Sequence, residues 1–171
     1  TRRSSDLEAH QKTIDYINGG GSGDEGEGGA SLGSTTARFQ PENEIRGIPA
    51  GRVMDTAVMD LINTVQLENS GADVSAAALF KGTSDLPEGD INYGNIFDIY
   101  KFDNTLYRVK VTGAELKAYM EWSAECYNQW QEGDINLSFD PEYPDYLYDM
   151  FAGVDYEIDL SQPKGQRIQN V

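Results

Sequence analysis

The chain has few of the side chains that most hydrolytic centres use. Its 171 residues include one histidine, His10, and one cysteine, Cys126. A two-metal hydrolytic centre needs a cluster of His, Asp and Asn ligands, which one histidine cannot supply. A single cysteine also excludes an internal disulfide. Because His10 lies in a polar stretch, we expect no Cys–His pair and interpret Cys126 as a packing residue on a helix face.

Positive charge is scarce too. Lys and Arg total 13 against 29 Asp and Glu, so the formal net charge is −16. Binding a phosphate backbone needs clustered Lys and Arg, which argues against a nucleic-acid partner. This composition leaves room for one nucleotide in a local pocket. No apolar run reaches the length of a membrane span, and we expect any export signal to lie outside the chain.

Short catalytic motifs are missing as well. The sequence contains no G-x-S-x-G elbow and no Walker loop. The run GGGSG resembles a phosphate-binding loop only in composition, because no strand precedes it and its neighbours are acidic. The acidic stretches DEGE and DPEYPDYLYD lack the ordered spacing of a calcium loop, so we interpret them as solvated surface.

What is present divides into three parts. The apolar residues of 1–18 have roughly helical spacing, which predicts a short connecting helix. Residues 19–33 contain eight glycines among Ser, Asp and Glu, which is typical of a flexible acidic linker. Residues 34–171 carry the hydrophobic patterning of a folded domain.

The first clear pattern in this domain is DTAVMDLINTVQLENSG. Asp55 or Thr56 can cap the start of a helix, and Gly71 stands where a left-handed C-terminal cap is favoured. The expected apolar stripe of this helix comprises Val58, Leu61, Ile62 and Val65. The next segment, ADVSAAALF, predicts a short buried strand. INYGNIFDIY predicts a brief strand followed by a single helical turn.

A second pattern covers TLYRVKVTGAELKAYMEWS. Tyr107, Val109 and Val111 alternate with two basic residues, Arg108 and Lys110, which predicts a strand with one solvent-exposed face. The TGAE that follows has the spacing of a capping box, so a helix is expected directly after the strand. Its apolar face comprises Leu116, Tyr119, Met120 and Ser123, and its solvent face comprises Glu115, Lys117, Glu121 and Glu125.

The C-terminal part predicts two further strands. VDYEIDL, residues 154–160, alternates apolar with acidic side chains. Arg167 and Ile168 begin a second extended stretch. An aromatic-rich irregular segment precedes both.

Phe102 is the aromatic residue with the strongest functional interpretation. Most aromatic side chains in the chain are expected to pack in the core or against loops. Phe102 instead lies in a turn before the predicted strand, between Lys101 and Asp103. An exposed ring beside hydrogen-bonding groups suits a nucleobase, because stacking on an aromatic side chain contributes about 1–3 kcal/mol.

Together these segments resemble the C-terminal domain of the 5′-nucleotidase family. The resemblance is carried by ADVSAAALF and by LPEGDINYGNIFDIYKFDNTLYRVKVTGAELKAYME. EWSAECYNQW and FAGVDYEIDLSQPKGQRI narrow it to the branch containing bacterial 2′,3′-cyclic-nucleotide 2′-phosphodiesterase/3′-nucleotidases. It extends from about Ile45 to Val171. It implies an α+β fold with a mixed β-sheet and flanking helices, incomplete at its C-terminus.

The resemblance also implies that substrate binding and metal binding belong to different domains. In this family the C-terminal domain binds the nucleoside part of the substrate, and a separate N-terminal metallophosphoesterase domain holds a divalent metal pair. Phe102 matches the first stacking aromatic, and Asn104 would brace its turn and contact substrate. Many members carry Asn-Gly-Gly-x-Arg where this chain reads FKGTSD, so ribose recognition is expected to differ. Lys81 in that stretch is a candidate contact.

The expected parent is a nucleotide phosphohydrolase that is secreted, periplasmic or attached to the cell wall. Its substrate would be a nucleotide or nucleoside, and this chain alone would be inactive. The motif for the second stacking aromatic is not found in the sequence. Two alternatives therefore stay open. One is a non-catalytic binding or interaction module that retains the fold, and the other is a piece that pairs with another chain through an exposed sheet edge, a homodimer included.

Overall fold

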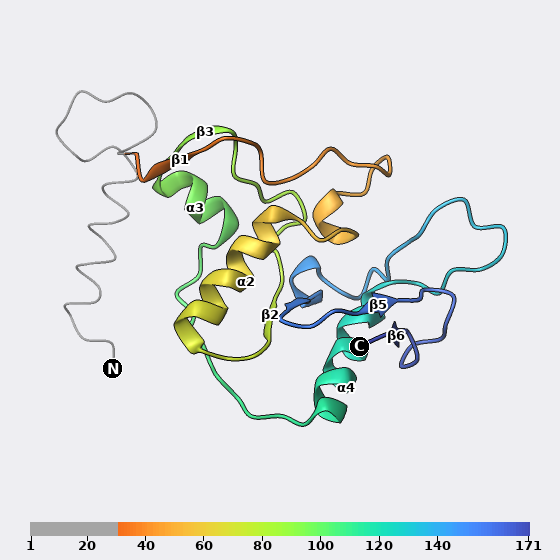
Figure 1. Cartoon of the computed structure of the whole chain (residues 1–171). Helices are drawn as coiled ribbons and strands as arrows, with labels where there is room; N and C mark the ends of the chain where they lie inside the picture. Colours follow the sequence, from red (N-terminus) through yellow and green to blue (C-terminus); the bar gives the residue numbers. More distant parts are fainter. Residues whose placement is uncertain (1–30) are drawn as a thin grey trace. The chain divides into compact units, whose positions relative to one another are not determined.

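The computed structural model describes residues 31–171, which form two compact units (Figure 1). The predicted helix at 1–18 and most of the predicted linker lie outside the described residues. The α+β class is confirmed, with short helices and three two-stranded antiparallel sheets in the described chain. No helix in this part of the chain is long and apolar enough to span a bilayer. The smaller unit comprises 31–39 and 85–101, and the larger comprises 40–84 and 102–171.

The smaller unit is a strand pair followed by a helix. Strand β1 (Gly33–Thr35) pairs antiparallel with β3 (Gly89–Ile91), so the last residue of the predicted linker belongs to the fold. Helix α3 (Tyr93–Ile99) has seven residues and is longer than the single turn predicted. Asn92 and Asn95 explain its start, because each side chain accepts a hydrogen bond from the backbone N–H of the other.

In the larger unit, helix α2 (Ala57–Ser70) confirms the first helical pattern. Thr56 is its N-cap residue, and Gly71 closes it in the left-handed region at φ 59°. The predicted stripe is partly wrong, because Val65 is 50% exposed. The buried residues of this helix are Val58, Met59 and Asn63.

Asn63 joins α2 to a strand pair. Strand β2 (Ser75–Ala77), predicted as buried, pairs antiparallel with β4 (Met150–Ala152). The Ser75 hydroxyl donates to Asn63 Oδ1 at 2.7 Å, and Asn63 Nδ2 donates to the Met150 carbonyl at 3.4 Å. A buried amide with both partners satisfied fixes the helix against both strands.

The second helical pattern is also confirmed. Helix α4 (Gly113–Ser123) begins at the predicted capping box, where the Thr112 N–H donates to Glu115 Oε2 at 2.7 Å. These hydrogen bonds hold the pKa of Glu115 below its usual value. The helix continues into a 3₁₀ turn, η2 (Ala124–Cys126), which buries Cys126 as expected.

Helix α4 packs against the strands of the C-terminal part. Strand β5 (Glu157–Ile158) pairs antiparallel with β6 (Ile168–Gln169), so both predicted extended stretches contain strands, although short ones. The buried core here consists of Met120, Ala124, Phe151 and Ile168.

Glu121 corrects the predicted solvent face of α4, because its side chain is buried. Its carboxylate accepts two hydrogen bonds from β6 and the residue before it: from the Arg167 N–H at 2.8 Å and from the Ile168 N–H at 2.9 Å. Arg167 is also fully buried, and its Nη1 donates to the carbonyls of Ala124 and Tyr127 at 2.8 and 2.9 Å. Helical periodicity could not reveal this, because the partners lie more than 40 residues away.

The strand predicted from Tyr107 to Val111 is wrong. This segment has no regular secondary structure, and every residue in it is exposed. It follows the outside of the larger unit between α2 and α4, without a strand beside it (Figure 1). The alternation of side chains is present, but a strand forms only where a second strand supplies hydrogen bonds, and no described segment does so.

Two glycines fix the loop after β2 against the 3₁₀ turn η1 (Ala50–Arg52). A Cβ at Gly51 would lie 2.5 Å from Gln40 Nε2 and 2.6 Å from Leu79 Cδ1. A Cβ at Gly82 would lie 2.7 Å from Arg52 Cγ. Such approaches leave no room for a side chain, so this loop and turn can meet only through glycine.

We expect Glu121→Ala to lower the free energy of unfolding by about 3 kcal/mol, because it leaves two buried backbone N–H groups without acceptors. Denaturant unfolding followed by circular dichroism measures the change. Glu132→Ala is the matched control, since Glu132 is exposed and its loss should change stability by less than about 0.5 kcal/mol. Equal effects of the two substitutions would contradict the assigned role of Glu121.

Gly51→Ala should destabilise the larger unit by about 1–3 kcal/mol, because the added methyl group overpacks a filled contact. Gly113→Ala is the control: nothing lies within 4 Å of a Cβ there, and alanine suits a helix better than glycine. Thermal unfolding should show a lower Tm for the first variant and an unchanged or higher Tm for the second. An unchanged Tm in Gly51→Ala would contradict the close approach.

Candidate functional site

The loop fixed by the two glycines places Phe80 beside Phe102. The ring centroids lie 4.9 Å apart with an interplanar angle of 71°, an edge-to-face contact. Phe102 is 46% exposed, and Phe80 is half-buried. In this geometry each ring keeps at least one face that the other does not cover. Phe102 is therefore exposed, as the sequence predicted.

The other two predicted residues lie on the same two segments. Lys81 follows Phe80 directly and is exposed, and its carbonyl accepts from the Ser84 N–H at 2.9 Å, which closes a turn. Asn104 is exposed two residues after Phe102. The ring contact thus brings together the segment of Lys81 and the segment of Phe102 and Asn104.

Gln40 anchors the loop that contains Phe80 and Lys81. Its buried Nε2 donates to the carbonyls of Gly82 and Ser84 at 3.2 and 3.0 Å. Ser84 is fully buried. These bonds fix the backbone on the C-terminal side of Phe80, so the ring is carried by an anchored loop. A pre-ordered ring loses less entropy when a flat ligand stacks on it.

Two residues of this region were not predicted from sequence. The sequence places Phe80 at the end of the predicted strand ADVSAAALF and at the start of FKGTSD, without a functional role. Its contact with Phe102 depends on a fold that brings together residues 22 positions apart. Arg52 is the second. The loop itself contains no arginine. The aliphatic part of the Arg52 side chain, however, lies against Gly82 of the loop. The Arg52 guanidinium lies 3.8 Å from the centre of the Phe139 ring. No local signal marks either residue.

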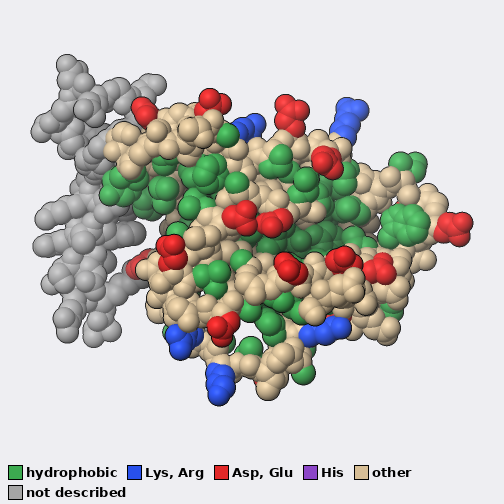
Figure 2. All heavy atoms as spheres, in the orientation of Figure 1, with side chains coloured by type: hydrophobic (Ala, Val, Ile, Leu, Met, Phe, Trp, Pro, Cys, Tyr) green, Lys and Arg blue, Asp and Glu red, His purple; other side chains and the backbone are tan. Residues whose placement is uncertain are grey.

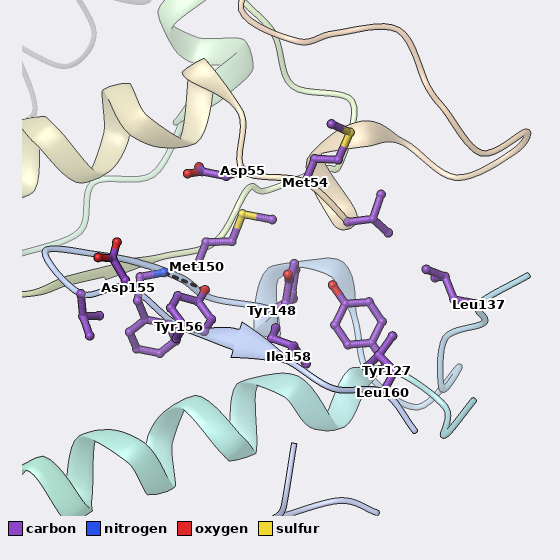
Figure 3. A pocket seen from close by; sticks show the side chains of 13 residues that line it. Met54, Asp55, Tyr127, Leu137, Tyr148, Met150, Asp155, Tyr156, Ile158 and Leu160 are labelled. Carbon is purple, nitrogen blue, oxygen red and sulfur yellow. Dashed lines mark hydrogen bonds between the residues drawn. The ribbon is translucent and has the colours of Figure 1, made fainter. Parts of the chain in front are cut away.

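A separate pocket of about 390 Å³ lies elsewhere in the larger unit (Figure 3). Three tyrosines line it, and burial raises the pKa of Tyr127, Tyr148 and Tyr156. Asp55 and Asp155 add carboxylates to the lining. No lysine or arginine lines it, so it suits apolar or cationic groups better than phosphate. None of the sequence-predicted site residues belongs to it.

The described surface has few basic side chains for a free phosphate and no cluster of side chains suited to a metal ion. Figure 2 shows more Asp and Glu than Lys and Arg side chains on the face in view. Residues 31–171 contain no cluster of three or more His, Cys, Asp or Glu side chains placed to bind a metal. Burial raises the pKa of Cys126 to about 11, so the thiol stays protonated near neutral pH and does not act as a nucleophile.

Comparison with known proteins identifies relatives whose names describe enzymes that act on nucleotides. The chain is 33% identical over 125 residues to a 2′,3′-cyclic-nucleotide 2′-phosphodiesterase/3′-nucleotidase of Yersinia enterocolitica, covering 57% of this chain and 19% of that protein. It is 34% identical over 82 residues to the trifunctional nucleotide phosphoesterase protein YfkN of Bacillus subtilis (strain 168), covering 47% and 6%. The chain thus spans less than a fifth of the length of these curated relatives.

Two solved structures share the fold. A Staphylococcus aureus protein, named as a 5′-nucleotidase in complex with alpha-ketoglutarate, matches 99% of this chain and 31% of its own, with a TM-score of 0.71 and 24% identity. A 5′-nucleotidase precursor from Thermus thermophilus matches 95% and 27%, with a TM-score of 0.62 and 19% identity. A sequence profile of the family described as "5′-nucleotidase, C-terminal domain" matches residues 33–171. The chain belongs to this family, as its sequence motifs predicted.

Proposed function

We propose that this chain is the nucleoside-binding part of a metal-dependent nucleotide phosphohydrolase, with the ring of Phe102 as the surface on which the base stacks. The observation that carries the proposal is the Phe102 ring itself, which is 46% exposed and fixed by an edge-to-face contact with Phe80. An exposed aromatic ring can stack with any of the common bases, because each base has a flat π-surface.

Polar groups near the ring give the ligand its orientation in this proposal. Asn104 and Lys81 lie on the two segments that meet at the ring contact. An amide can hydrogen-bond to the edge of a base or to a ribose hydroxyl, and an ammonium group can pair with a phosphate. With a single lysine in the loop and a net charge of −16 for the chain, we assign most of the binding energy to the base.

The chemistry of phosphate hydrolysis is assigned to another part of the parent protein. The described residues do not fit a metal pair, because no cluster of suitable ligands exists among them. We propose that a separate metallophosphoesterase domain supplies the divalent metals, and that the present chain alone is inactive. The names of the similar proteins support 2′,3′-cyclic nucleotides and 3′-nucleotides as the substrate class.

The cellular location of the parent protein is part of the same proposal. Enzymes that degrade extracellular nucleotides act outside the cytoplasm, so we place it in the periplasm, at the cell wall or in the medium. The name of the Thermus thermophilus structure, a precursor, is in keeping with an exported protein. Within the parent, the metallophosphoesterase domain would be the partner of this chain.

Titration with adenosine tests the base site. We expect Phe102→Ala to weaken binding by about 5-fold to 150-fold, the equivalent of losing about 1–3 kcal/mol of stacking. The fluorescence of the two tryptophans, or amide chemical shifts, follows the titration. Phe102→Tyr keeps a flat ring and should bind nearly as well as the unchanged protein.

Tyr146→Ala controls for the loss of an exposed aromatic residue elsewhere, since Tyr146 is 57% exposed and takes no part in the proposed site. It should leave the affinity for adenosine unchanged. Equal affinities of Phe102→Ala and the unchanged chain would contradict stacking on this ring. No binding by the unchanged chain would favour a non-catalytic module that retains the fold.

A further inference from the structure

The direction of the Phe102 ring depends on contacts between side chains. Phe102 lies outside the helices and strands of the described chain. An exposed ring exchanges rotamers on the picosecond to nanosecond timescale unless a contact favours one of them. Phe80 makes such a contact, with the ring centroids 4.9 Å apart and the ring planes at 71°. Because edge-to-face pairs are favourable beyond the area that they bury, the Phe80 ring favours one rotamer of Phe102.

Phe80 can act in this way because its own backbone is fixed on both sides. Leu79, directly before it, is 4% exposed and belongs to the core. Directly after it, the Ser84 N–H donates to the Lys81 carbonyl at 2.9 Å and closes a turn. Phe80 is half-buried, whereas Phe102 is 46% exposed. Phe80 is thus the more firmly held of the two rings, and Phe102 is the more open to a ligand.

The turn after Phe80 depends in its turn on the amide of Gln40. The Gln40 Nε2 donates to the Gly82 carbonyl at 3.2 Å and to the Ser84 carbonyl at 3.0 Å. A side-chain amide has two N–H donors, and these two bonds use both. Gly51 of η1 lies against the same nitrogen, and Gln40 is 6% exposed. Loss of this amide would leave both carbonyls without their buried donor, which is costly.

We propose that Phe80 is a positioning residue of the base site, which holds the Phe102 ring in the rotamer that stacks with the base, and that Gln40 positions Phe80. This inference rests on the proposed function, because it takes Phe102 as the stacking surface. The contacts run from the Gln40 amide to the carbonyls of the turn, and from Phe80 beside that turn to Phe102. Neither Phe80 nor Gln40 has to touch the ligand.

The size of the effect follows from the rotamers of Phe102. When only a fraction of the molecules has the ring in the binding rotamer, the apparent dissociation constant rises by the inverse of that fraction. An edge-to-face pair is strong enough to favour one rotamer by about 2-fold to 12-fold. Loss of the Phe80 ring should weaken the binding of adenosine by up to this factor, which is less than the loss of the Phe102 ring itself should cost.

The rotamer of Phe102 can be measured without a ligand. Three-bond couplings from its Cγ to the backbone nitrogen and carbonyl carbon report the χ1 populations in the isotopically labelled full chain. We expect one dominant rotamer in the unchanged chain and in Phe80→Tyr, which keeps the aromatic ring, and averaged couplings in Phe80→Ala. Averaged couplings in the unchanged chain, or unchanged couplings in Phe80→Ala, would overturn the proposal.

Gln40→Met tests the step from Gln40 to Phe80. Methionine has nearly the length of glutamine but donates no hydrogen bond, so we expect averaged Phe102 couplings and weaker binding of adenosine. Gln129→Met is the matched control, because the exposed Gln129 donates to the Ser161 carbonyl at 2.7 Å in another loop. It should change neither quantity. Amide shifts outside the two loops show that both variants are folded, and unchanged Phe102 couplings in a folded Gln40→Met would overturn the role of Gln40.

A double-mutant cycle with adenosine distinguishes positioning from direct contact with the ligand. Phe80→Ala should weaken binding by about 2-fold to 12-fold when Phe102 is present. It should have no further effect in Phe102→Ala, because the ring that it positions is gone. Weakening by the same factor in both backgrounds would overturn the proposal, since Phe80 would then act on the ligand independently of Phe102.

The two variants also separate this proposal from the proposed function. Equal affinities of the unchanged chain and Phe102→Ala for adenosine would contradict base stacking on Phe102, whatever the couplings show. Weaker binding by Phe102→Ala together with full affinity in Phe80→Ala would leave the stacking surface in place and overturn positioning by Phe80.

Discussion

The buried carboxylate of Glu121 is the constraint on which the larger unit depends. It accepts the backbone N–H groups of Arg167 and Ile168, while the Arg167 guanidinium donates to two carbonyls near the end of α4. Each charged group thus satisfies backbone groups that would otherwise be buried without partners, which offsets part of the cost of removing both charges from water. Glu121 and Arg167 thus fix the hairpin of β5 and β6 against α4, although each of these strands is short. Through the shared core, they also fix β4 and, with it, β2.

The aromatic site depends on this frame through the loop that follows β2. Glycine at two points of contact and the amide of Gln40 determine where the loop lies, and the loop determines where Phe80 meets Phe102. The ring that we assign to base stacking lies in a stretch, residues 101–112, that has no regular secondary structure. The edge-to-face contact with Phe80 ties the ring to the anchored loop, and Phe102 stays 46% exposed.

The sequence predicted the local features well and the long-range ones poorly. The caps at Thr112 and Gly71 depend on neighbours within a few positions, and the structure confirms them. The burial of Glu121 depends on a strand more than 40 residues away, so helical periodicity placed it on the wrong face. The strand at 107–111 has the right pattern without a partner, and pattern alone cannot say whether a partner exists. For the candidate site, the motif located Phe102, but nothing local could indicate Phe80 or Arg52.

Family membership and fold are established by the profile match and the structural likeness, whereas the ligand site rests on the geometry of one ring. The most direct measurement is the intermolecular nuclear Overhauser effect between adenosine and the isotopically labelled chain. Base stacking on Phe102 predicts contacts from the base protons to the ring protons of Phe102, with weaker contacts to Phe80. Bound adenosine whose base protons contact only the residues of the tyrosine-lined pocket, and neither phenylalanine ring, would contradict the account.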